Sequence, residues 1–158
     1  MFYNRRWKSE NETLRFSQRR NVTVWLAEWL RREDKKYGKK QFGYGCMRLP
    51  LLNAEDPVSF DYPLIEKLFD AYMEQGFTYF DTAYTYHGYH GEEAVRKALV
   101  ERHPRESFEL ATKLPLRDFK DGEDMERIFN EQLDHCGVEY FDYYLLHNMG
   151  TNVYEKCR

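Results

Sequence analysis

The chain has 158 residues, with 24 Lys and Arg against 27 Asp and Glu and a formal net charge of -3. This balance argues against an electrostatic nucleic-acid-binding surface, although the first third is locally basic. No apolar run approaches the roughly 18 residues of a membrane span, and the N-terminus lacks the apolar segment of a secretory signal. We therefore expect a cytoplasmic protein with neither a nucleic-acid nor a membrane partner.

Two parts of the chain differ in composition. Residues 1–36 form a divergent basic extension, rich in Arg, Lys, Glu and Asn. Residues 37–158 alternate apolar, strand-like runs with helical patterns, and this alternation predicts one domain. The three cysteines show no Cys-x-x-Cys spacing, so they indicate neither a disulfide framework nor a metal site.

Strands are predicted at residues 41–46, 77–80, 107–112 and 140–146. A first helix begins at Asp61, carries Pro63 in its first turn and ends at Gly76. Two more helices are predicted at 92–102 and 124–136, and Gly137 stops the last one. Residues expected to face inward repeat at helical spacing: Ile65, Leu68, Phe69, Tyr72, Ala94, Val95, Ala98, Leu99, Met125, Ile128, Phe129 and Leu133.

The resulting order is strand and helix in strict alternation. Helical crossovers between successive strands imply a parallel sheet in an α/β fold. Four strands with three helices correspond to about half of an eightfold (β/α)8 TIM barrel. The sequence thus predicts about half a barrel, preceded by the divergent extension.

Chemically active side chains follow the predicted strands. Asp81, Lys113 and His147 each come where an apolar run ends, and Tyr86 follows Asp81 in the same loop. Because ligands gather at the carboxyl ends of parallel strands, we expect these four side chains to converge on one site.

The four residue types suit the reduction of a carbonyl group. Tyr86 is the candidate proton donor. A tyrosine has an ordinary pKa of about 10 and donates well near neutral pH only beside a cation, which Lys113 would supply. Asp81 would keep that ammonium charged and oriented in a dry pocket, and His147 would hydrogen-bond the substrate oxygen.

The motifs Gly43-Tyr-Gly-Cys-Met-Arg48, Asp81-Thr-Ala-Tyr-Thr-Tyr86, Ala111-Thr-Lys113 and Asp142-Tyr-Tyr-Leu-Leu-His-Asn148, in this order, resemble the aldo/keto reductase family. The resemblance runs from about residue 37 to the end. It implies an NAD(P)H-dependent (β/α)8 barrel that reduces aldehydes or ketones, with a catalytic tetrad at Asp81, Tyr86, Lys113 and His147. Cofactor contacts are implied for Gly45, Met47, Arg48 and Asp81, with NADPH as the expected cofactor and NADH as the alternative.

The amino-acid sequence around Cys46 and His147 is similar in particular to a bacterial branch of this family. The longer members of that branch carry a C-terminal iron–sulfur segment, which is not found in this sequence. The family's dinucleotide is held mainly by loops of the second half of its barrel. An alternative is therefore a non-catalytic half-barrel that self-associates, or pairs with a partner, through open strand edges.

Other patterns lead to less specific readings. Gly43-x-Gly45 lacks the third glycine of a dinucleotide fingerprint, because Arg48 stands at that position. His87 and His90 near Glu92 and Glu93 fit no standard metal-ligand spacing, so no metal is expected; a metal-dependent barrel hydrolase is the remaining, distant alternative. Tyr84 competes with Tyr86 for the acid role, and these two histidines, with His103 and His135, are expected on loops or helix surfaces.

Overall fold

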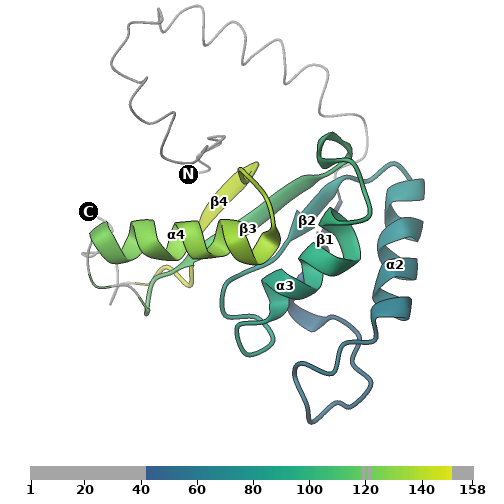
Figure 1. Cartoon of the computed structure of the whole chain (residues 1–158), viewed down its shortest axis with the longest axis horizontal. Helices are drawn as coiled ribbons and strands as arrows, with labels where there is room; N and C mark the ends of the chain where they lie inside the picture. Colours follow the sequence, from purple (N-terminus) through teal and green to yellow (C-terminus); the bar gives the residue numbers. More distant parts are fainter. Residues whose placement is uncertain (1–41, 119, 121, 151–158) are drawn as a thin grey trace, which may run out of the picture.

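The computed structural model describes residues 42–118, 120 and 122–150, so the predicted extension lies outside the described residues (Figure 1). Its four strands form one parallel sheet in the order β1-β2-β3-β4. The strands are β1 (Gly43–Gly45), β2 (Tyr79–Asp81), β3 (Glu109–Pro115) and β4 (Tyr143–His147). The predicted parallel α/β fold is confirmed. Within the described part of the chain, no helix is long and apolar enough to cross a membrane.

The register of the sheet brings the strand ends to one edge. Gly45 pairs with Asp81 and Asp81 with Ala111, so β1 and β2 end level with Ala111, four residues before the end of β3. The remainder of β3 continues past β2 and pairs with β4 as far as Pro115, opposite His147. The carboxyl end of β3 therefore stands clear of β2.

Three helical segments cross between the strands and lie over one face of the sheet (Figure 1). Helix α2 (Tyr62–Glu74) begins where the Asp61 side chain accepts a hydrogen bond from the Leu64 N–H, and the chain leaves it at Gly76 with φ of 82°. Helix α4 (Gly122–Cys136) is followed by Gly137, whose φ is 65°. Both predicted stops are confirmed.

The second predicted helix is divided. It begins as α3 (Gly91–Val95) and continues as a π-helical turn, η3 (Arg96–Val100). The predicted apolar face is nevertheless correct, because Ala94, Val95, Ala98 and Leu99 are all fully buried. Within the residues that the structure describes, two short 3-10 turns complete the elements: η2 (Cys46–Arg48) follows β1, and η4 (Arg105–Ser107) precedes β3.

Two residues expected to face inward are exposed instead. Leu68 is 38% exposed, since the neighbouring Phe69 occupies the core-facing position of α2. Met125 is 44% exposed, because it lies in the first turn of α4, and the buried positions of that helix begin only at Ile128. Leu68 and Met125 do fall in the helical period of their apolar neighbours. However, the buried face of each helix covers fewer residues than the apolar pattern predicts.

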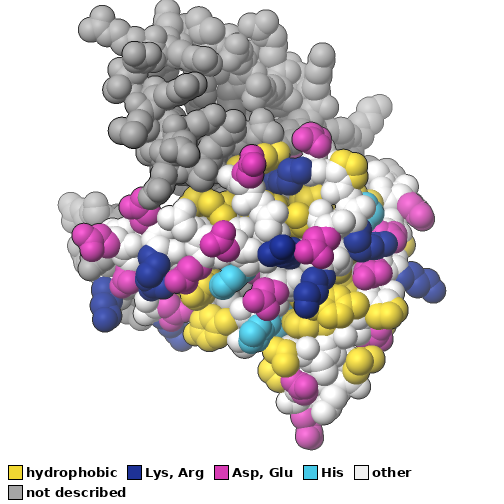
Figure 2. All heavy atoms as spheres, in the orientation of Figure 1, with side chains coloured by type: hydrophobic (Ala, Val, Ile, Leu, Met, Phe, Trp, Pro, Cys, Tyr) yellow, Lys and Arg dark blue, Asp and Glu magenta, His cyan; other side chains and the backbone are white. Residues whose placement is uncertain are grey.

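The core lies between the helices and the sheet and is strongly aromatic. Phe80 of β2 is fully buried, with ring centroids 4.9 Å from Phe69 and 5.1 Å from Tyr72 of α2. Burying a side chain of this size contributes about 1.5–3 kcal/mol. Outside this core, Figure 2 shows basic and acidic side chains intermixed over the helix-covered face. The core thus anchors β2, which ends at Asp81, and with it the following turn that carries Tyr86.

Candidate active site

Lys113 forms the centre of a polar cluster at the carboxyl end of the sheet. Its Nζ forms an ion pair with the Asp81 carboxylate, donates to the Thr82 carbonyl oxygen at 2.7 Å, and lies 3.0 Å from the Tyr86 hydroxyl. The Lys113 side chain is 12% exposed and that of Asp81 25%. An ammonium this buried needs a carboxylate partner, and Asp81 provides it.

Tyr86 is held in place by the turn that follows β2. Its N–H donates to the Ala83 carbonyl at 3.1 Å, and its carbonyl accepts from the Gly91 N–H at 3.0 Å. A Cβ added to Gly91 would come within 2.8 Å of the Tyr86 Cβ, so only glycine permits this close approach. The phenol ring, as a result, lies against Lys113, whose Nζ is 4.7 Å from the ring centroid.

His147 completes the cluster from β4. It is the last residue of that strand, and its ring meets the Tyr86 ring nearly edge-on, with centroids 5.6 Å apart. Burial, and then the neighbouring Lys113 charge, lowers the pKa of His147 below its usual value. The imidazole is therefore neutral near pH 7 and has one N–H to donate.

The structure brings all four predicted residues together, with Lys113 paired to Asp81 as expected. One feature differs from the sequence prediction. Asp81, Lys113 and His147 are predicted to follow their strands, yet all three lie within them, because β2 ends at Asp81, β3 runs on to Pro115 and β4 ends at His147. A strand residue has a fixed backbone, so these three side chains are aimed by the sheet itself.

The predicted cofactor residues Gly45, Met47 and Arg48 lie beside this cluster, at the end of β1 and in η2. Gly45 pairs with Asp81, and a Cβ built on it meets no atom within 4 Å. Met47 is 55% exposed, and Arg48 is exposed as well. Open space, an exposed apolar side chain and a cation fit a large anionic ligand at this point.

Tyr84 does not belong to the cluster. Its hydroxyl donates to Glu131 of α4 at 2.8 Å, and its ring stacks on that of His135. Burial, together with the Glu131 carboxylate, raises the pKa of Tyr84 to about 12. Tyr84 therefore faces the helix layer, whereas Tyr86 faces Lys113.

The histidines near Tyr86 have local partners. His87 Nε2 accepts from the Leu49 N–H at 3.1 Å, with Nδ1 3.1 Å from the Pro57 carbonyl, and His90 pairs with Glu93 at 3.0 Å. In the part of the chain that the structure describes, no three His, Cys, Asp or Glu side chains are grouped to hold a metal ion.

Sequence reasoning missed a second polar cluster, on the helix side of the sheet. Glu92 and Gln132 are fully buried there, although Glu92 was interpreted only as part of a metal-like pattern. The signal was present: Glu92 is in phase with Val95 and Leu99, and Gln132 falls midway between Ile128 and Cys136 on the apolar face of its helix. A polar residue on an apolar face indicates a buried polar network.

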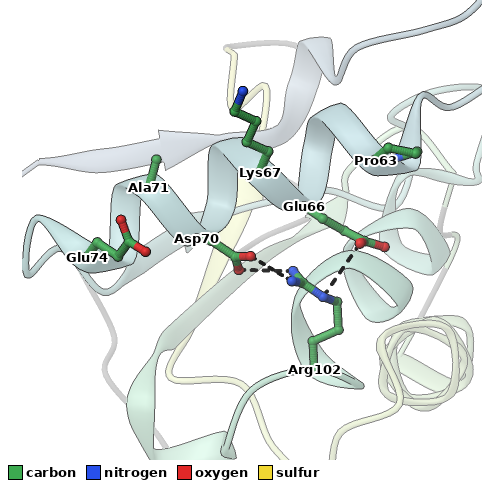
Figure 3. A pocket seen from close by; sticks show the side chains of 7 residues that line it. All are labelled: Pro63, Glu66, Lys67, Asp70, Ala71, Glu74 and Arg102. Atoms are coloured by element: carbon green, nitrogen blue, oxygen red, sulfur yellow. Dashed lines mark hydrogen bonds and ion pairs between the residues drawn. The ribbon is translucent and has the colours of Figure 1, made fainter.

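A surface hollow lies away from both clusters, on the outer side of α2 (Figure 3). Arg102 reaches into it and pairs with Asp70 at 2.6 Å and with Glu66 at 3.7 Å. Both carboxylates already neutralise the Arg102 cation. Lys67 and Glu74 line the hollow as well.

The fold and the cluster define a class of protein: a parallel α/β fold with its polar residues at the carboxyl ends of the strands, as in α/β barrels. The comparisons identify the family. The family model of the aldo/keto reductases matches residues 41–157, and the chain belongs to the aldo/keto reductase family. The resemblance noted in the sequence is confirmed, whereas its assignment to the iron–sulfur branch stays a prediction.

Solved structures with the same fold are aldo-keto reductases. A thermostable aldo-keto reductase in complex with the inhibitor epalrestat shares 24% identity at a TM-score of 0.58, over 75% of this chain and 42% of that one. The aldo-keto reductase from Klebsiella pneumoniae in complex with NADPH shares 26% identity at a TM-score of 0.54, over 68% and 35%. An aldo-keto reductase from a Medee basin deep-sea metagenome library shares 27% identity at a TM-score of 0.50, over 74% and 38%.

The chain thus spans about two fifths of the length of these structures. No curated protein matches it. The half-barrel prediction agrees with these coverages, because the four described strands correspond to part of the barrel.

Proposed function

We propose that this chain carries the proton-donating half of an NAD(P)H-dependent reductase of aldehydes or ketones. The observation that carries the proposal is the contact of Lys113 Nζ with both the Asp81 carboxylate and the Tyr86 hydroxyl. An ammonium held beside a phenol stabilises the phenolate that remains once the proton has been given up. Tyr86 is then the general acid.

Three residues support Tyr86 in this proposal. Lys113 carries the positive charge, and Asp81 holds that charge in place from the end of the neighbouring strand. His147, neutral because its pKa is lowered, donates an N–H to the substrate carbonyl oxygen and so directs that oxygen toward the Tyr86 hydroxyl. The substrate would bind where the Tyr86 and His147 rings meet.

The hydride for this reaction would come from NADPH, or NADH, when bound. Gly45, Met47 and Arg48 are the residues of the first strand end that would contact the cofactor, with Asp81 beside them. The open space at Gly45 and the exposure of Arg48 support that assignment. The Klebsiella pneumoniae enzyme in complex with NADPH makes NADPH the first cofactor to test.

The direct test has two parts. The purified chain is titrated with NADPH while the fluorescence is recorded, and NADPH consumption is then assayed with a panel of aldehydes and ketones. Because this chain spans about two fifths of the length of the related structures, we expect weak cofactor binding, and any NADPH consumption should depend on Tyr86. Activity that survives in the Tyr86→Phe variant would contradict the assigned acid.

A second candidate is the non-catalytic half-barrel, and the sheet order favours it. In the part of the chain that the structure describes, β1 and β4 are the outer strands, each with one strand neighbour, and Leu146 of β4 is 44% exposed. Such edges pair readily with a second copy of the chain or with another protein. Chromatography with light scattering distinguishes the two: a dimer without NADPH binding supports this candidate, and a monomer that binds NADPH contradicts it.

A further inference from the structure

The buried cluster behind β3 connects three elements to the backbone of Lys113. Glu92 of α3, Thr112 of β3 and Gln132 of α4 are each fully buried. Glu92 Oε1 accepts from the Thr112 hydroxyl at 2.6 Å and from Gln132 Nε2 at 2.8 Å. The helix layer is thereby joined to the residue next to Lys113.

Gln132 also reaches Lys113 itself. Its Nε2 lies 3.1 Å from the Lys113 carbonyl oxygen and 3.0 Å from the Thr112 hydroxyl, and its Oε1 accepts from the Tyr144 hydroxyl at 2.7 Å. Glu92 and the Lys113 carbonyl both face Nε2 as acceptors, so the amide has only one satisfactory orientation. Gln132 therefore fixes α4 to β3 and β4 together.

The sheet explains why this carbonyl needs a side-chain partner. Alternate carbonyls of a strand point to the same side, and the Ala111 carbonyl accepts from the Thr82 N–H at 2.9 Å. Two residues further on, the Lys113 carbonyl points to that side as well, but β2 has ended at Asp81. Gln132 Nε2 supplies the hydrogen-bond donor that a longer β2 would have provided for the Lys113 carbonyl.

The two sides of β3 carry different groups. Side chains alternate along a strand, so Thr112 points into the helix layer while Lys113 points away from it, toward Asp81 and Tyr86. A fully satisfied buried polar network is rigid, whereas a partly satisfied one is costly. The buried network therefore fixes the backbone of Thr112, and this also fixes the backbone of the next residue, Lys113, from which the ammonium side chain extends.

We propose that Gln132, oriented by Glu92, is a positioning residue that fixes the Lys113 backbone and so directs its ammonium at Tyr86. The inference rests on the proposed function, in which Lys113 supports the acid. Neither Gln132 nor Glu92 touches the place where the substrate would bind; both act through Lys113.

The test follows the Lys113 ammonium directly, by nitrogen-15 NMR of the lysine side chains, and needs no activity. Three acceptors hold this ammonium, so its protons exchange slowly with water in the unaltered chain. The Lys113→Met variant assigns the signal. In Gln132→Met we expect exchange that is faster by roughly tenfold or more, while backbone amides of β2 keep their protection.

Glu131→Gln is the matched control, because Glu131 lies next to Gln132 on α4 but contacts Tyr84 and Arg127 instead. It should leave the Lys113 ammonium unchanged. If Gln132→Met does not fold, the double variant Glu92→Met with Gln132→Met replaces both partners by apolar chains, and we expect the same acceleration.

The outcomes separate the two proposals. Slow exchange in both the unaltered chain and the Gln132 variants overturns the positioning role and leaves the proposed function intact. Fast exchange in the unaltered chain means that the Lys113 cluster is not held in solution, which overturns the proposed site as well.

Discussion

The ring of His147 stands nearly perpendicular to that of Tyr86, at 85° between the planes and 5.6 Å between the centroids. The two side chains come from separate elements: Tyr86 from the turn after β2, and His147 from the end of β4. Ring centroids this close place the two side chains in direct edge-to-face contact. This relationship makes the role of each residue separately testable.

Removal of the Tyr86 hydroxyl should abolish most of the proposed activity. We expect Tyr86→Phe to lower turnover by roughly 10²-fold or more, the range for loss of a general acid, with little loss of NADPH affinity. Steady-state kinetics and fluorescence titration measure both. Tyr84→Phe is the control, because its hydroxyl contacts Glu131, and it should leave turnover within about twofold.

Replacement of the central cation should damage both activity and stability. Lys113→Met leaves the Asp81 carboxylate without its ion-pair partner, so we expect a turnover loss comparable to that of Tyr86→Phe. We also expect the free energy of unfolding to fall by about 1–3 kcal/mol, less than for a fully buried pair because Asp81 is 25% exposed. Urea denaturation measures the second effect; Lys67→Met, at an exposed position of α2, should show neither.

His147 should titrate below the ordinary histidine pKa of about 6.5. Burial is the larger cause of its lowered pKa and the Lys113 charge the second, so Lys113→Met should raise the value only part of the way back. Activity that needs neutral His147 should persist below pH 6.5 and fall only as the pH passes through this lowered pKa. NMR of the histidine ring carbons measures the titration; a value at or above 6.5 would contradict the burial of this ring.

His135 should make the folded chain less stable as the pH rises. Its hydrogen bond with Glu92 raises its pKa in the folded chain, so the folded state holds this proton more tightly than the unfolded state. The contribution is fully present below about pH 6.5 and is lost as the pH rises through the raised value. Unfolding free energies at several pH values should show this loss in the unaltered chain and not in His135→Gln. His90→Gln, at a half-exposed site, should retain it.

The sequence was sufficient for the features that depend on local pattern. The strand and helix alternation, the start of α2 at Asp61, the stops at Gly76 and Gly137 and the convergence of four residues all follow from spacing and from the rule that parallel strand ends meet.

Features that depend on tertiary packing could not be found in this way. The end of β3 at Pro115 depends on pairing with β4, which no local pattern encodes. Glu92 and Gln132 stand out as polar residues on apolar helix faces, but the donors of this buried carboxylate, Thr112 and Gln132, come from distant segments that no local pattern identifies. The catalytic and cofactor roles, and the cytoplasmic location, stay predictions.

Gly91 shows how the backbone near Tyr86 restricts change in the sequence. The position serves as the first residue of α3 and as the point where that helix touches the Tyr86 backbone, so a single added methyl group would displace both. A library randomised at residue 91 and selected for folded protein should return glycine almost exclusively. The restriction thus falls on a residue that has no side-chain functional group.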